Sequence, residues 1–316
     1  MRIFSWFCCF LFLIGFAKAQ QLPIDNQYLI NAFSLSPAYA GYNSSIETFI
    51  LHRQNWIGIE GAPKTSSFNL NGSITENMGL GGSISSDKIG VFKNFSSSLA
   101  YAYRLKFNDN RFLSFGLAAG FFESNIDITG SNNKSGLDPV VGVNQNMRNV
   151  AFDATAALAF QDRNLRAGLV VPRIIESEIN EGTATYTLKR HYIFHSSYLI
   201  DLSSDLQTIP SVVLRKTASS NLFYEFATSV RYQKQLWMGI NYRRGTSIGI
   251  LAGFLINNKL AVNYSYEFGQ GMLSNSSGNH EISLGFLLGK GKPNRFSVFS
   301  KESISRKKPY YKWLNN

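Results

Sequence analysis

Cysteine is absent from all but the start of this 316-residue chain, because Cys8 and Cys9 are its only two. Both lie in a segment laid out as a secretory signal: Arg2, an apolar run over residues 3–16, and the small-residue cleavage site Ala17-Lys18-Ala19. We predict a signal peptide over residues 1–19, since the apolar run is too short for a membrane anchor. The exported chain then has no disulfide, thiolate metal site or cysteine nucleophile.

Long hydrophobic runs are also missing after residue 19, which excludes a transmembrane helix there. A chain without such a helix can cross a membrane only as a closed β-barrel, because every backbone polar group must be paired within the bilayer. The relevant signal is therefore alternation of apolar and polar residues with a period of two.

This alternation runs through most of the chain. In residues 94–105 the odd positions are mainly apolar or aromatic and the even ones mainly polar. Residues 260–268 and 281–288 alternate in the same way, with the apolar or aromatic residues at the even positions. About fourteen such segments occur, centred near Ile50, Leu70, Gly82, Leu99, Leu117, Ala156, Leu169, Ser196, Val213, Phe226, Ile240, Leu251, Tyr264 and Leu284. A soluble β-sandwich has the same period, so alternation by itself does not choose between the two.

The connections between these segments decide in favour of a barrel. One end is expected to carry short turns, near residues 75–77, 106–110, 161–164, 203–207, 233–234 and 257–259. The other end is expected to carry long loops, at residues 57–64, 123–148, 173–185 and 269–277. Segregation of this kind is typical of bacterial outer-membrane barrels. We therefore predict an all-β fold, a single antiparallel transmembrane barrel of about fourteen strands over residues 45–288.

The face predicted to line the lumen is rich in small residues, including Gly79, Gly81, Gly116, Gly249 and Gly253. Small residues leave space, which either water or a peptide would fill. The peptide would be residues 20–44, as an N-terminal latch or plug, or a partner. The glycines also fit a second interpretation, in which they only permit sharp coiling of the strands.

Positive charge is concentrated at the C-terminus. The chain has a formal charge of +11, and residues 289–316 hold eight Lys or Arg against the single Glu302. In an exported protein such a tail favours an anionic surface or acidic protein over nucleic acid. An even strand count returns the chain to its starting side, so residues 289–316 are predicted to form a basic periplasmic tail.

Catalysis and metal binding find little support in the sequence. The four histidines are His52, His191, His195 and His280. On one strand His191 and His195 would lie about 13 Å apart, too far to share an ion. The glycine cluster at residues 79–82 has no lysine and precedes no helix, which argues against a phosphate-binding loop. We expect no catalytic residue, no cofactor and no metal.

Several short motifs occur in order along the chain: Ser36-Pro37-Ala38-Tyr39-Ala40-Gly41, Arg53-Gln54-Asn55-Trp56-Ile57-Gly58, Gly61-Ala62-Pro63-Lys64-Thr65, Asp87-Lys88-Ile89-Gly90 and His280-Glu281-Ile282. Together they resemble the PorP/SprF family of outer-membrane proteins of the type IX secretion system. Two positions depart mildly from the family pattern: Ser36 replaces the usual Asn, and Glu267 the usual Asp. The long basic tail has no clear counterpart in the family.

The resemblance implies a non-enzymatic part in secretion or surface attachment of large, gliding-type adhesins. The implied partners are the translocon, its periplasmic lipoprotein ring and secreted adhesins with a C-terminal sorting domain, besides outer-membrane lipid. The alternative function is a passive porin or solute transporter on the same barrel.

Candidate partner contacts fall in four places. The first is the turn-forming motif at residues 36–41, before the first strand. The second is residues 53–63, around the first long loop, where Trp and Arg suit a binding surface. The third is Asp87 in the Asp87-Lys88-Ile89-Gly90 motif, and the fourth is the tail. The residues are Ser36, Pro37, Tyr39, Gly41, Arg53, Trp56, Pro63, Asp87, Lys307, Lys308 and Trp313.

Overall fold

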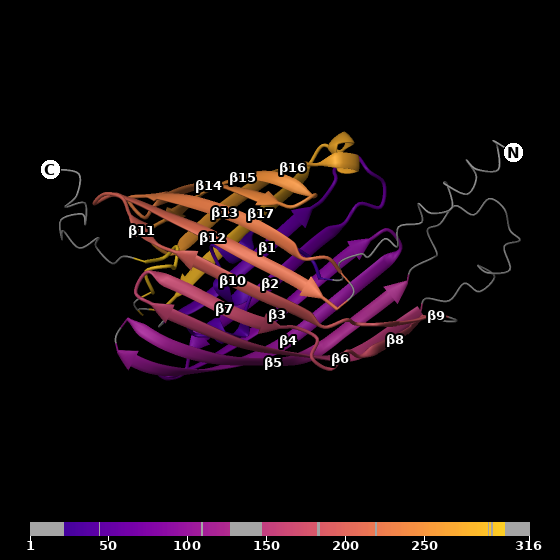
Figure 1. Cartoon of the computed structure of the whole chain (residues 1–316), viewed down its shortest axis with the longest axis horizontal. Coiled ribbons are helices and arrows are strands. Elements are labelled where there is room, and N and C mark those ends of the chain that lie inside the picture. Colours follow the sequence, from indigo (N-terminus) through magenta and orange to yellow (C-terminus); the bar gives the residue numbers. More distant parts are fainter. Residues whose placement is uncertain are drawn as a thin grey trace, which may run out of the picture.

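A computed structural model describes residues 22–43, 45–108, 110–126, 147–181, 184–218, 220–289, 291 and 293–300. Strands dominate the described residues (Figure 1). Their bounds are β1 (Ile46–Gln54), β2 (Lys64–Ser73), β3 (Met78–Ile89), β4 (Phe92–Asn108), β5 (Arg111–Ile126), β6 (Met147–Asp162), β7 (Leu165–Val171), β8 (Glu178–Glu181), β9 (Ala184–Thr187), β10 (His191–Tyr198), β11 (Ile200–Asp201), β12 (Leu206–Thr217), β13 (Phe223–Tyr232), β14 (Leu236–Arg243), β15 (Ser247–Ile256), β16 (Leu260–Gly269) and β17 (Asn279–Leu288).

The sheet closes on itself. Sequential antiparallel neighbours pair throughout, β1 pairs with β17, and β10 pairs with both β7 and β12. Because β10 and β11 are separated only by Leu199, they act as one strand of the ring. The ring therefore has fourteen strands, and each of the fourteen predicted strand centres lies within one of them. The predicted fold is confirmed. Strands β8 and β9 form a separate hairpin.

Alternation sends apolar side chains outward and small or polar ones inward. In β4, Leu99 is 77% exposed whereas its neighbours Ala100 and Ala102 are buried. In β17, Ile282 is exposed whereas Glu281 and Ser283 are buried. A wide apolar outer face with a polar interior is the reverse of a soluble protein and matches a barrel in lipid. Within the described residues, no helix is long and apolar enough to cross a membrane.

The two ends of the barrel differ. At the turn end, β2–β3, β4–β5, β6–β7, β13–β14 and β15–β16 are joined by a few residues each, and β1 begins and β17 ends there. At the loop end lie residues 55–63, the β8–β9 hairpin and the 3-10 helix η4 (Gly271–Asn275), grouped on one side of Figure 1. Strands β5 and β6 extend beyond the predicted bounds, so the long connection there is residues 127–146, which lie outside the described residues.

Candidate functional site

Residues 22–43, here called the N-terminal segment, lie inside the barrel. The segment runs from the loop end, where Leu22 to Asp25 neighbour Trp56, to the turn end, where the backbone of Gly41 lies close to Gly72 and Gly79. It folds as three 3-10 helices, η1 (Gln27–Leu29), η2 (Ala32–Ser34) and η3 (Pro37–Tyr39).

Capping side chains explain why the segment folds into short turns. The Asn31 side chain accepts a hydrogen bond from the Phe33 amide (3.2 Å), and the Ser36 hydroxyl accepts one from the Ala38 amide (3.3 Å). Pro37 occupies the first position of η3, where its missing N–H costs nothing. The segment thus satisfies part of its own backbone inside the lumen.

A buried cluster of charges, here called the ion network, lies at the loop end of the lumen. Arg53 donates to Glu267 (2.6 Å) and Glu281 (2.8 Å). Arg243 donates to Glu225 (2.9 Å) and Glu267 (2.6 Å). These five side chains come from β1, β13, β14, β16 and β17, and each is at most 5% exposed. Paired charges of this kind are stable in a buried site only because each has its partner.

The ion network holds the start of the N-terminal segment. Asn26 donates its amide N–H to Glu281 (3.0 Å to Oε2) and its side chain to Glu267 (2.7 Å), and its side-chain oxygen accepts from Arg243 (2.8 Å). The Tyr28 hydroxyl donates to Glu225 (2.6 Å). The segment is therefore joined to four strands through two of its residues.

Asp25 adds a carboxylate next to this network. Burial raises the pKa of the Asp25 carboxyl above its ordinary value, and three nearby guanidinium groups act against that rise. They belong to Arg53, Arg215 and Arg243.

Small residues on the strands accommodate the rest of the N-terminal segment. A Cβ added at Gly79 would lie 2.0 Å from the Ala40 carbonyl oxygen, and one at Gly116 would lie 2.2 Å from the Ala38 nitrogen. A Cβ at Gly81 would meet the Phe33 ring at 2.3 Å. Three of the five glycines predicted to line the lumen therefore fit closely around a peptide, whereas Gly249 and Gly253 lie against side chains of the barrel itself.

A second stretch of chain, residues 293–300, closes the turn end and is here called the C-terminal segment. Arg295 donates to Asn164 (2.6 Å) and Asp201 (2.7 Å) on one side of the ring. On the other side the Ser297 hydroxyl donates to Glu47 (3.1 Å). Strands β1 and β11 lie on opposite sides of the ring, so the C-terminal segment spans its mouth.

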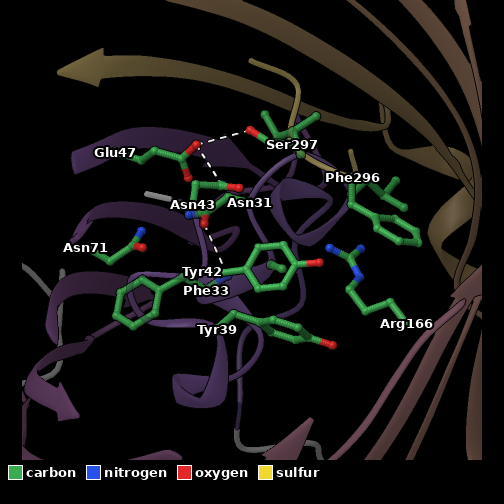
Figure 2. Close-up of a pocket in the computed structure, with 13 residues that line it drawn as sticks. Asn31, Phe33, Tyr39, Tyr42, Asn43, Glu47, Asn71, Arg166, Phe296 and Ser297 are labelled. Atoms are coloured by element: carbon green, nitrogen blue, oxygen red, sulfur yellow. Dashed lines mark hydrogen bonds between the residues drawn. The ribbon is translucent and has the colours of Figure 1, made fainter. Parts of the chain in front are cut away.

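The two segments meet at this end of the lumen. The Asn294 amide donates to the Asn43 side chain (2.7 Å), and the fully buried Phe299 packs against Phe49 at 5.9 Å between ring centroids. Figure 2 shows Tyr39, Tyr42 and Asn43 gathered with Phe296 and Ser297 around a small pocket. The Arg166 guanidinium lies 4.8 Å from the centre of the Phe296 ring.

A cavity of about 630 Å³ lies at the opposite end, above the start of the N-terminal segment. Leu22 to Asp25 line it from below, and its walls are largely apolar and aromatic. We call it the loop-end cavity; its aromatic lining residues are Trp56, Phe122, Tyr186 and Phe223.

The candidate partner contacts separate into three groups. Trp56 and Pro63 line the loop-end cavity. A second group is buried inside the barrel and contacts other parts of this chain: Ser36, Pro37, Tyr39, Gly41, Arg53 and Asp87. Asp87 accepts a hydrogen bond from Thr65 (2.6 Å) and also borders the cavity. Lys307, Lys308 and Trp313 lie outside the described residues.

Sequence reasoning missed the ion network. Its signal was present, because Glu225, Arg243, Glu267 and Glu281 are charged residues on the inward-facing parity near one end of their strands. Charges of both signs at such positions indicate pairing across the lumen. As for metals, the described residues contain no group of three or more His, Cys, Asp or Glu side chains that could hold an ion.

A closed fourteen-strand barrel with an apolar outer face and a polar, chain-filled interior defines an outer-membrane β-barrel protein. The chain is similar in fold to the CymD monoaromatic hydrocarbon channel, at 9% identity over 85% of this chain and 94% of that one, with a TM-score of 0.52. The P. putida toluene transporter TodX is also similar, at 7% identity over 84% and 95% of the two chains and a TM-score of 0.48. At such identities the likeness concerns the fold alone.

Sequence comparison identifies the family. The model of the type IX secretion system membrane protein family PorP/SprF matches residues 17–286. The chain belongs to this family, which confirms the resemblance seen in its sequence. Among curated proteins, none matches the sequence significantly.

Proposed function

We propose that this protein is a non-enzymatic outer-membrane component of the type IX secretion system that works by binding protein partners. It would act in secretion or surface attachment of large, gliding-type adhesins. Membership of the PorP/SprF family supports the system, and the role in adhesin handling rests on the family resemblance.

The observation that carries this proposal over a passive porin is the filled lumen. The N-terminal segment occupies the barrel along its length, and the C-terminal segment spans the turn-end mouth. A porin depends on a continuous aqueous path between its two ends. A barrel filled by its own chain suits a protein that presents surfaces rather than one that conducts.

Two surfaces are offered to partners in this proposal. With the loops outside the cell, the loop-end cavity with Trp56 and Pro63 faces the surface and would contact the adhesin or the translocon. After signal-peptide cleavage behind Ala19, the turn end faces the periplasm. The basic tail, including Lys307, Lys308 and Trp313, would then meet the periplasmic lipoprotein ring.

Affinity purification from detergent-solubilised outer membranes tests the proposal. Tagged wild-type protein should co-purify with secretion-system components, and deletion of the gene should remove an adhesin from the cell surface. A Trp56→Ala variant should recover less partner, whereas Ile248→Ala, on the lipid-facing side of β15, should recover as much as wild type. Conductance in a planar bilayer together with no recovered secretion component would instead establish the porin alternative.

A further inference from the structure

The N-terminal segment is bound to the barrel in the manner of a ligand. Among the described residues, every backbone-to-backbone hydrogen bond of the segment stays within the segment. It neither pairs with a strand edge nor extends the sheet. Its hydrogen bonds to the barrel involve a side chain on one partner or both.

Lumen side chains recognise the backbone of the segment. The Arg104 guanidinium donates to the Ala40 carbonyl (3.1 Å), the Ser114 hydroxyl donates to the Ala38 carbonyl (2.7 Å), and the Asn71 side chain accepts from the Gly41 amide (3.1 Å). Side-chain contacts to main-chain groups, combined with a few specific anchors, are how grooves bind peptides. Here the specific anchors are Asn26 and Tyr28, which donate hydrogen bonds to Glu267 and Glu225 of the ion network.

The charged side chains of the strands near the anchors balance one another without the N-terminal segment. Near the anchors the strands themselves supply three arginines, Arg53, Arg215 and Arg243, and three glutamates, Glu225, Glu267 and Glu281. Their formal charges cancel, and Asp25 of the segment adds one more negative charge. Removing the segment therefore leaves equal numbers of positive and negative charges, with the four ion pairs of Arg53 and Arg243 intact.

We propose that the lumen is a peptide-binding channel and that the N-terminal segment is its intramolecular ligand. The ligand class is a peptide that presents an Asn-x-Tyr sequence to the ion network and small residues, as at Ala38, Ala40 and Gly41, to the glycine-lined strands. Any peptide of this chemistry, including a second copy of the segment, can replace the segment once its covalent link to β1 is cut.

A nicked full-length protein tests this proposal. A protease site in a flexible Gly/Ser insert at position 44 allows the link to be cut after the barrel has folded. Fluorescent peptide of residues 20–43 should then exchange into the barrel saturably. A peptide with Asn26→Ala and Tyr28→Phe should compete on the order of tenfold to a hundredfold more weakly, because it lacks hydrogen bonds to buried charged groups.

Two controls make the result decisive. A peptide with Pro23→Ala should compete as well as wild type, since Pro23 is exposed in the loop-end cavity. A folded nicked barrel, verified by its heat-modifiable mobility on SDS–PAGE, that never exchanges its segment or binds the double variant equally well would overturn the proposal.

A second measurement needs no nick. In the intact chain carrying Asn26→Ala and Tyr28→Phe, hydrogen–deuterium exchange of the segment's amides should quicken about tenfold or more while the strand amides stay unchanged. Segment and strands quickening together would show that the segment is an inseparable part of the folded core, contrary to the proposal.

Discussion

Gly79 and Gly82 belong to the same strand, β3, but face opposite sides of it. A Cβ at Gly79 would overlap the Ala40 carbonyl, which is backbone and cannot move aside alone, whereas a Cβ at Gly82 would make ordinary contacts at 3.6 Å or more. The same amino acid thus has two roles: inside, it leaves room for the N-terminal segment, and outside, it is a tolerant position facing lipid.

Gly79→Ala should displace the N-terminal segment, because the added carbon and the Ala40 backbone cannot share that space. We expect a lower thermal midpoint, measured as loss of heat-modifiable mobility, and faster proteolysis of the segment. Gly82→Ala is the matched control and should behave as wild type. Equal stability of the two variants would contradict the close fit described for the lumen.

Glu267 bridges the two arginines of the ion network, and its loss leaves both with an incomplete set of partners. Glu267→Gln should destabilise the folded barrel by about 3 kcal/mol or more, as expected when one partner of a buried ion pair is removed. Urea unfolding in lipid vesicles measures this change. The control is Glu76→Gln, which removes the exposed ion pair with Lys106 and should leave the unfolding midpoint close to that of wild type.

At the scale of elements, the C-terminal segment separates two parts of the chain that the sequence presents as one tail. Residues 293–300 cross the turn-end mouth and bury Phe296, Val298 and Phe299, whereas five of the eight Lys and Arg residues of the tail lie further on, from Lys301 to Lys312. Binding by the tail and closure by the C-terminal segment can therefore be tested independently.

Truncation after Ser300 should leave barrel stability unchanged, because the buried aromatic residues remain. Truncation after Gly289 should lower the thermal midpoint, since it removes Phe299 from its contact with Phe49 and the Ser297 hydroxyl from Glu47. If partner recovery falls already in the first variant, the basic residues bind partners. Normal recovery in the first variant would make them dispensable.

At the scale of the whole molecule, the segregated ends predict an orientation in the membrane. The predicted mature chain has no cysteine, so a single introduced one reports its own location. Glu60→Cys lies in a loop and Ser204→Cys in a turn, and both positions are exposed. A membrane-impermeant maleimide should label the first in intact cells and the second only after lysis. The reverse pattern would mean that the loops face the periplasm.

Alternation and loop length were enough to predict the strands, since each depends on residues close together in the sequence. Side-chain pairing inside the barrel was harder to predict. Arg53, which stays a predicted partner contact, pairs within the chain with Glu267 and Glu281, each more than two hundred positions further on. Such contacts depend on strand register and on which strands lie opposite in the ring, and neither is visible in a local pattern.

The sequence alone determined that this protein is a fourteen-strand barrel with small residues inside. The period of two specifies which face of each strand meets lipid, and the turns and loops mark where each strand ends. Only the tertiary structure decided what the interior holds. Whether small residues leave a water-filled space or surround a peptide depends on the path of the chain between its ends. The closed ring brings Asn26, Tyr28 and the ion network together and places the C-terminal segment across the turn-end mouth.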